Sequence, residues 1–274
     1  MKNHFFVFAA FLSFLFFSCA EKSAPPKLSV DEDSVRGSYG KEIEISPMDS
    51  SVKITRGKIT IAPESENSVY EISGYFDGQI VCATKNTVLR LKNVFLENSS
   101  GMPVIKSAAK IEISSESGSE NFIVTKGRKF SKYGAINCAK GLVLGGSGKL
   151  SVKGGCHGIE AGDVKIKGSG TLIVEGTKKG TALTCESLVV EEGKTFRAYF
   201  LNSKNGIRAD DSISILSGNF FLYDNETAFK TDRAEKSKDK SHFVNLNGGE
   251  FHTFRNGILF ESDSVNKNAK FIEE

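Results

Sequence analysis

The tripeptide Ile136-Asn137-Cys138 returns along this chain at nearly constant intervals, each time as an apolar residue, a variable residue and a small residue. The clearest copies begin at positions 136, 159, 183, 207 and 229, at steps of 23, 24, 24 and 22 residues: Ile136-Asn137-Cys138, Ile159-Glu160-Ala161, Leu183-Thr184-Cys185, Ile207-Arg208-Ala209 and Phe229-Lys230-Thr231. Two earlier copies are Ile80-Val81-Cys82 and Ile105-Lys106-Ser107, and Ile258-Leu259-Phe260 fits as a last one. Such self-similarity indicates a solenoid, whose single repeat cannot bury its own apolar face.

Each repeat holds two more short apolar runs, separated by glycine-bearing turns such as Gly145-Gly146-Ser147-Gly148. Examples are Leu142-Val143-Leu144 and Leu150-Ser151-Val152, which alternate with period two as strands do. We therefore predict an all-β chain, a single-stranded parallel β-helix with three short strands per coil and roughly eight coils, spaced ~4.8 Å apart. Strands near residues 41–45, 52–54 and 58–61 are expected to form an N-terminal β cap over the first coil.

Stacking the tripeptides predicts two columns of side chains. The inward column is Cys82, Ser107, Cys138, Ala161, Cys185, Ala209 and Thr231. The outward column is Val81, Lys106, Asn137, Glu160, Thr184, Arg208 and Lys230, which we call the polar ladder. This face is flat, regular and polar, so we expect a long polymer to lie along it.

The cysteines are interpreted through the same columns. Cys138 lies two coils from both Cys82 and Cys185, about 9.6 Å by strand spacing, which is beyond the reach of a disulfide. We therefore interpret these three as small buried fillers, and leave open the state of Cys156, which sits in the turn before His157 and outside the column. His157, His242 and His252 show no metal-ligand spacing and are expected to be ordinary surface residues.

Residues 1–18 resemble an export signal, with Lys2 followed by an apolar run too short for a permanent membrane span. The ending Phe17-Ser18-Cys19 resembles a bacterial lipobox, which predicts lipidation of Cys19, with ordinary cleaved secretion as the alternative. Residues 19–38 are predicted to be a polar linker from the lipid anchor to a single domain at 39–274. The expected location is the cell envelope outside the cytoplasm, with membrane contact through the anchor only. A net charge of +3 over 274 residues gives no reason to expect a nucleic-acid partner, and we expect a monomer.

Several short segments, in order and spacing, resemble a bacterial β-helix family of carbohydrate-binding domain proteins. They are Val69-Tyr70-Glu71-Ile72-Ser73-Gly74, Asp77-Gly78-Gln79-Ile80, Val88-Leu89-Arg90-Leu91-Lys92-Asn93-Val94, Asn98-Ser99-Ser100-Gly101, Ser119-Glu120-Asn121 and Asn205-Gly206-Ile207. The resemblance implies a right-handed parallel β-helix, similar in build to pectate lyases. It also implies binding of acidic or cellulosic polysaccharide with calcium and without cleavage.

One departure from the family concerns calcium. Family coils often read Asp-Asp-Gly-Ile at the turn into the first strand, whereas this chain has Ser203-Lys204-Asn205-Gly206 there. Acidic oxygens remain at Asp210, Asp211, Asp224 and Asp232, which we name as candidate calcium ligands. The alternative is that these are solvated turn residues.

The sequence predicts a binding protein rather than an enzyme. Pectate lyase-like β-helices use a basic residue to abstract a proton, and Arg208 is the position to test for that chemistry, with a polysaccharide lyase as one alternative function. An adhesin that meets a protein partner and a purely structural spacer are the others. A second candidate glycan contact lies in residues 117–133, which are expected to be a long loop outside the coils. It combines the cations of Arg128, Lys129 and Lys132 with the aromatic ring of Tyr133. The alternative is that this loop only keeps the protein soluble. The segment 231–242 is expected to be a polar surface loop.

Overall fold

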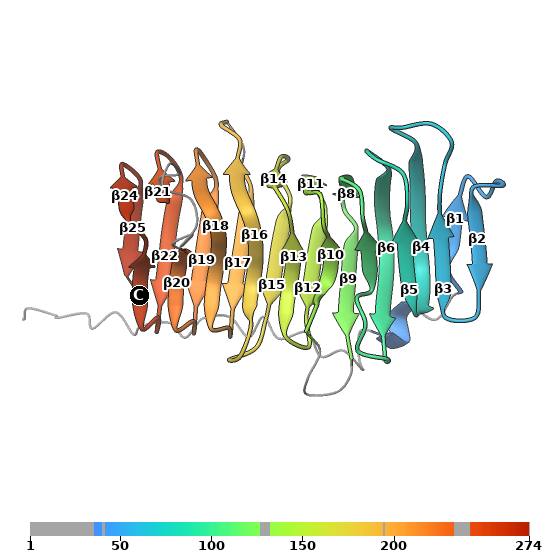
Figure 1. The fold of residues 1–274 in the computed structure, drawn as a ribbon, viewed down its shortest axis with the longest axis horizontal. Coiled ribbons are helices and arrows are strands. Elements are labelled where there is room, and N and C mark those ends of the chain that lie inside the picture. The colour runs from blue at the N-terminus through green and yellow to red at the C-terminus, as the bar shows by residue number, and fades with distance from the viewer. Residues whose placement is uncertain (1–35, 40–41, 127–131, 194, 233–241, 274) are drawn as a thin grey trace, which may run out of the picture.

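The strands of this protein stack along one axis, as Figure 1 shows from β1 and β2 at one end to β24 and β25 at the other. The computed structural model describes residues 36–39, 42–126, 132–193, 195–232 and 242–273. Within them the chain is all-β apart from the 3-10 turn η1 (Gly37–Tyr39), and its strands join into one sheet. Nearly all pairings are parallel, and only β1–β4 and β2–β3 run antiparallel.

The pairings arrange the strands in three columns, and we call one strand from each column a coil. The first column contains β3 (Lys58–Ile61), β5 (Gln79–Cys82), β7 (Ile105–Ser107), β10 (Gly134–Cys138), β13 (His157–Ala161), the first parts of β16 (Thr181–Val190) and β18 (Asn205–Ile215), β20 (Thr227–Thr231) and β23 (Ile258–Glu261). The second contains the first parts of β4 (Val69–Asp77) and β6 (Val88–Asn98), then β8 (Ile111–Ser115), β11 (Leu142–Gly146), β14 (Val164–Ile166), the second parts of β16 and β18, β21 (Phe243–Leu246) and β24 (Ser264–Lys267). The third contains the second parts of β4 and β6, then β9 (Glu120–Thr125), β12 (Lys149–Lys153), β15 (Thr171–Glu175), β17 (Arg197–Leu201), β19 (Asn219–Tyr223), β22 (Glu250–Phe254) and β25 (Lys270–Glu273). This is a β-helix-like architecture with three strands per coil.

The predicted register of the first column is confirmed over most of its length. Asn137 pairs with Lys106 on one side and with Glu160 on the other, and Arg208 pairs with Thr184 and with Lys230. The column also reaches one coil further toward the N-terminus than predicted. Thus β3 pairs in parallel with β5, so residues 58–61 belong to the first coil rather than to the cap. The cap among the described residues is made by β1 (Glu44–Ser46) and β2 (Val52–Thr55), which pair antiparallel with the first coil.

Two other sequence-based placements are corrected. Phe229 pairs with Phe260, so the last copy of the tripeptide is Phe260-Glu261-Ser262 rather than Ile258-Leu259-Phe260. A shift of two residues leaves the same side chains facing the core, so alternation alone does not exclude it. The prediction of a loop at 117–133 is also wrong in part, because the middle of this segment forms β9, a core strand of the third column.

The core fills the space between the three columns. Cys82, Cys138 and Cys185 are 1%, 0% and 3% exposed and are free thiols, which confirms their role as small buried fillers. In the C-terminal coils the core contains stacked rings, with the centroids of Phe220 and Phe251 5.2 Å apart. Coil-on-coil stacking of like side chains is what holds a solenoid together.

Hydrogen-bonded side chains hold the corner between the third and first columns. The buried Asn225 amide donates to the Phe200 carbonyl at 3.0 Å and to Asn256 Oδ1 at 3.2 Å. Its Oδ1 accepts from the Ser203 backbone N–H at 3.3 Å and from the Ser203 hydroxyl at 2.6 Å. Because Asn225 lies just before β20, this network fixes where the first-column strands begin.

The first described residues, 36–39, lie on the outer face of the third column. The Tyr39 ring packs against Phe95 and Phe122, and Arg36 lies 3.3 Å from Glu97. The described residues include no helix of the length and apolar character that crossing a bilayer requires.

Candidate functional site

A groove lies over the outer face of the first column, where the chain turns toward the second. Its volume is about 350 Å³, and β10, β13, β16 and β18 contribute its walls. The residues that line it are Asn137, Ala139, His157, Glu160, Ala161, Gly162, Thr184, Cys185, Glu186, Arg208 and Asp210. Four consecutive members of the polar ladder are among them, so the structure brings the predicted Asn137, Glu160 and Arg208 into one site.

At one end of the groove Glu160 is held from two sides. Its Oε2 accepts a hydrogen bond from the Asn137 side-chain amide at 2.9 Å and another from the Gly134 backbone N–H at 3.1 Å. Both contacts engage the same oxygen. The Glu160 carboxylate is therefore fixed in orientation, and among the described residues no hydrogen bond engages its other oxygen.

The sequence analysis missed His157 as a member of this site. His157 opens β13 and pairs with Gly134 of the preceding coil. Its Nδ1 accepts the Thr181 backbone N–H at 3.0 Å, so a neutral ring carries its proton on Nε2. Burial lowers the pKa of His157 and favours this neutral form. The signal available in the sequence was its position, two residues before Ile159 in the strand that carries Glu160.

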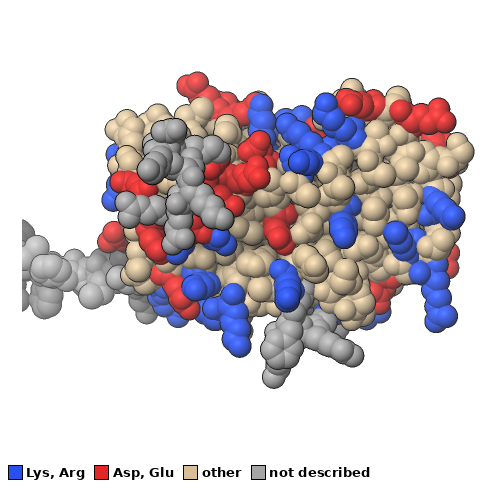
Figure 2. Space-filling view, viewed as in Figure 1, with Lys and Arg blue, Asp and Glu red and all other residues tan. Residues whose placement is uncertain are grey.

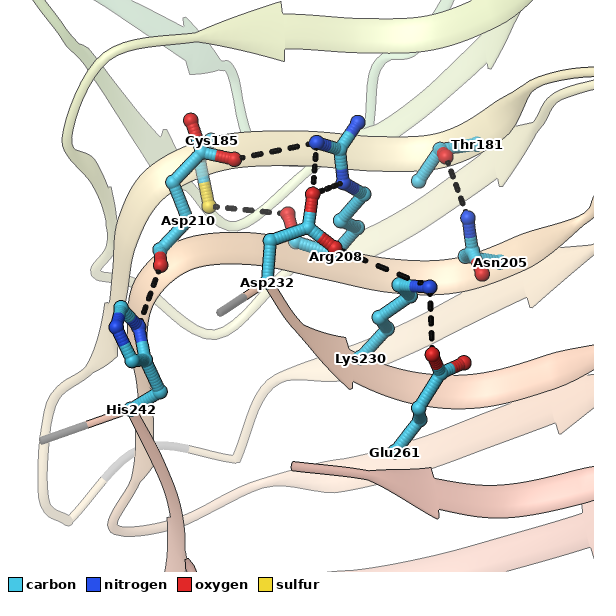
Figure 3. Close-up of polar contacts among 9 residues, drawn as sticks. All are labelled: Thr181, Cys185, Asn205, Arg208, Asp210, Lys230, Asp232, His242 and Glu261. Atoms are coloured by element: carbon cyan, nitrogen blue, oxygen red, sulfur yellow. Dashed lines mark hydrogen bonds and ion pairs between the residues drawn. The ribbon is translucent and has the colours of Figure 1, made fainter. Parts of the chain in front are cut away.

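Arg208 occupies the other end, where acidic side chains surround it (Figure 3). Its Nε donates to Asp232 Oδ2 at 2.7 Å, its Nη2 contacts the same oxygen, and Nη2 lies 3.4 Å from Asp210 Oδ1. Lys230, the next ladder cation, lies 2.7 Å from Glu261 and 3.9 Å from Asp232. Each ladder cation in this half of the molecule is thus paired with a carboxylate of the neighbouring coil.

Asp210 lies in a crowded acidic environment. Burial raises its pKa, and the nearby Asp232 and Asp211 carboxylates act in the same direction, while Arg208 opposes them. The backbone carbonyl of Asp210 also lies 2.9 Å from the His242 ring. His242 is 2% exposed, so the prediction that it is a surface residue is wrong. Figure 2 shows acidic side chains gathered over the upper part of β16 and β18, beside Lys and Arg side chains over β11 and β14.

The four candidate calcium ligands do not form one site, although Asp211 and Asp232 lie near Asp210. Asp210 and Asp232 both face Arg208, whereas Asp224 pairs with Arg255 at 2.7 Å beside the corner held by Asn225. No group of three or more His, Cys, Asp or Glu side chains positioned to hold a metal occurs within the described part of the chain. Calcium takes six to eight oxygen ligands, and a guanidinium in the middle of the acidic cluster opposes that. The described residues therefore do not fit calcium at this site.

The remaining predicted contacts lie outside the groove. Lys106 is an exposed ladder residue on β7, two coils before Glu160. Arg128 and Lys129 lie outside the described residues. Lys132 is exposed and Tyr133 is 45% exposed, just before β10.

A second outward surface, on the third column, is aromatic. The Tyr199 and Phe221 rings stack at 4.4 Å and 10°, and the Phe221 and His252 rings stack at 4.5 Å and 17°. Sugar stacking on an aromatic residue uses the face of the ring, and here Tyr199 and His252 cover the two faces of Phe221. This surface is therefore less suited to a saccharide than the groove.

Comparison with known families and structures agrees with this architecture. The family model described as carbohydrate-binding domain-containing protein matches residues 55–164 and again residues 160–271. The chain belongs to this family. Two successive matches are what a chain built from repeating coils gives. Arg208, at one end of the groove, falls in the second match and Asn137, at the other end, falls in the first, so the groove spans both matched segments.

Among solved structures, this chain is similar to one described as the polysaccharide lyase-like protein from C. thermocellum, gadolinium derivative. The two share 18% sequence identity with a TM-score of 0.53, over 82% of this chain and 90% of the other. At that identity the likeness concerns the fold. No curated protein matches the sequence.

Proposed function

We propose that this carbohydrate-binding domain protein binds a polysaccharide along the polar ladder, with the groove as the central contact, and does not cleave it. The observation that carries the proposal is the continuous register from Lys106 through Asn137, Glu160, Thr184 and Arg208, which presents one polar side chain per coil. A regular row of this kind matches the regular spacing of a polymer. Family membership supports carbohydrate as the ligand class.

The chemistry of the groove favours binding over catalysis. A lyase needs a base that is free to take a proton, and the guanidinium of Arg208 instead donates to Asp232. His157 uses Nδ1 to accept a backbone N–H, and its Nε2 carries a proton that can be donated to a sugar oxygen. Hydrogen-bond donors and acceptors that are already oriented can recognise hydroxyl groups.

The proposal includes the setting predicted from the sequence: an exported, monomeric lipoprotein held at Cys19 in the cell envelope, with a right-handed β-helix presented outside the cytoplasm. The signal-like residues 1–18 and the lipobox-like ending support it. Labelling with a radioactive fatty acid should mark the wild type, whereas a Cys19→Ala variant should stay unlabelled. The aspartates around Arg208 do not fit the predicted calcium, and the chelator arm of the binding experiment checks whether binding depends on the ion.

The binding experiment compares two substitutions on one strand. Thr184 and Val189 both face outward on β16, Thr184 in the groove and Val189, 40% exposed, on the second column. We expect Thr184→Arg to fill the groove and weaken retention in a polysaccharide-containing native gel, and Val189→Arg to retain wild-type binding. The panel covers acidic and cellulosic polymers, with and without a chelator.

Three results would count against the proposal. Loss of binding in both variants, or in neither, would show that the glycan does not bind along the polar ladder. Retention of no polysaccharide by the wild type would remove the binding function. An unsaturated uronide absorbance that grows with time would replace binding by a lyase activity.

A further inference from the structure

The charges that line the groove are unbalanced. Glu160, Glu186 and Asp210 contribute three carboxylates, and Arg208 is the one lining residue with a permanent positive charge. With His157 neutral, the lining therefore carries a net charge of about −2, three negative charges against one positive. A narrow polar groove with an excess of one sign repels ligands of that sign.

The single cation of the lining is already neutralised from outside it. Asp232, which belongs to the next coil and does not line the groove, takes both the Nε and the Nη2 donors of Arg208. The adjoining Lys230 is paired with Glu261 in the same manner. A uronate that approached Arg208 would have to displace the Asp232 carboxylate, which is fixed next to its partner by the chain itself.

Glu186 is the acidic residue best placed to act on a ligand. Its side chain is exposed on the groove wall, and no hydrogen bond or ion pair engages it within the described part of the protein. Glu160, by contrast, has one oxygen committed to two donors, and Asp210 faces Arg208. The negative potential of Glu186 therefore reaches the groove without a local counter-charge.

We infer that the groove selects a glycan without carboxylate groups, built from neutral or amine-bearing sugar residues, and excludes polyuronates. This inference rests on the proposed polysaccharide-binding function and states which class of polymer that function takes. A neutral hydroxyl can accept from the Nε2–H of His157 and donate to the free oxygen of Glu160, whereas a carboxylate can only accept. An ammonium group on an amino sugar would in addition meet Glu186 as a counter-ion.

The size of the selection follows from simple electrostatics. One unit charge about 8 Å from a bound uronate changes affinity about twofold in bulk-water dielectric at low salt. Two uncompensated carboxylates therefore disfavour each uronate about fivefold relative to a neutral sugar. Replacing Glu186 by lysine changes the local charge by two units, and should recover about the same factor.

The test uses matched pairs of polymers whose two members differ in the charge of one substituent on each sugar. Polygalacturonate is compared with its fully methyl-esterified form, and N-acetylglucosamine oligomers are compared with their de-acetylated form, all at low salt with a chelator. Affinity is measured by native gel retardation and by calorimetry on wild type, Glu186→Lys and Glu192→Lys. Glu192 is an exposed glutamate next to the turn between the second and third columns, outside the groove, so its variant controls for net charge.

We expect the wild type to bind the methyl ester about fivefold or more tightly than the acid, and the de-acetylated oligomer at least as tightly as the acetylated one. Glu186→Lys should remove the difference in affinity between the acid and the ester, whereas Glu192→Lys should keep that difference. Tighter binding of the acid by the wild type, or an unchanged acid-to-ester ratio in Glu186→Lys, would overturn the charge selection while leaving carbohydrate binding intact. Binding of neither member of either pair would overturn the selection together with the function on which it rests.

Discussion

Replacing Asn225 by alanine tests whether the hydrogen-bonded corner holds the coils in place. Asn225 is 2% exposed, and its side chain makes four hydrogen bonds, two to Ser203 and one each to the Phe200 carbonyl and Asn256. Alanine removes all four and leaves the Ser203 N–H and the Phe200 carbonyl without this partner. A buried polar group that loses its partner costs about 1–3 kcal/mol, and water that enters the vacated space recovers part of the loss.

We therefore expect Asn225→Ala to lower the free energy of unfolding by about 3 kcal/mol. For a domain of this size each kcal/mol lowers Tm by about 2–4 °C, so the expected decrease is about 6–12 °C. The measurement is thermal unfolding followed by circular dichroism, with urea unfolding as a second probe.

The matched control is Asn245→Ala. Asn245 faces outward on β21, and its Oδ1 accepts from the Asn266 side chain at 3.1 Å. Loss of an exposed contact of this kind changes stability by about 0.5 kcal/mol or less. Equal Tm decreases for Asn225→Ala and Asn245→Ala would refute the reasoning, because the buried network would then contribute no more than a surface one.

Three further outcomes are expected. Phe229→Ala should lower the free energy of unfolding by about 3–5 kcal/mol, because it empties a fully buried site beneath the Phe260 ring; a urea midpoint close to the wild type would contradict this. The lowered pKa of His157 means that the folded state binds fewer protons than the unfolded state, so stability should fall as pH decreases below the ordinary histidine value of about 6.5. The His157→Gln variant should lose less stability over that range, as Tm measured against pH will show. A thiol reagent applied to the native protein should modify Cys156 before the buried cysteines, whose pKa values burial raises, and Cys156→Ser should remove that first phase.

Most of the first column could be predicted because its inner positions admit few side chains. Cys138 and Ala161 lie in adjacent coils, Cys138 fully buried and Ala161 partly buried against the core, and a close-packed interior favours small residues there. The predicted register is wrong at the last coil, where Ile258, Leu259 and Phe260 are all apolar. Volume and polarity do not distinguish Ile258 from Phe260 there, and only the pairing of Phe229 with Phe260 sets the register.

The first strand of the solenoid was assigned to the cap for a related reason. Residues 58–61 alternate in the same way whether they pair in a hairpin or in a coil. In the structure β3 does both, antiparallel with β2 on one side and parallel with β5 on the other. Local pattern determines that a segment is a strand, and the pairing partners come from the tertiary fold.

The site could be predicted as a row of residues but not as a set of contacts. The outward positions follow from periodicity, so Asn137, Glu160 and Arg208 were placed on one face. The role of Asp232 did not follow, because an aspartate two residues beyond a ladder position is compatible with calcium, water or a neighbouring cation. The structure resolves this, since the side chain of Arg208 in the preceding coil reaches it.

The chemistry of the ladder is therefore set by pairs of residues in successive coils rather than by single positions. A cation such as Arg208, taken alone, predicts affinity for an acidic sugar. The carboxylate of Asp232, one coil further on, cancels that charge and keeps the guanidinium in place. Glu186 has no such partner within the described residues, so its charge persists in the groove. The sign of the charge that a ligand meets thus depends on which charges lining the groove have a counter-charge in the next coil, and for this chain that balance is negative.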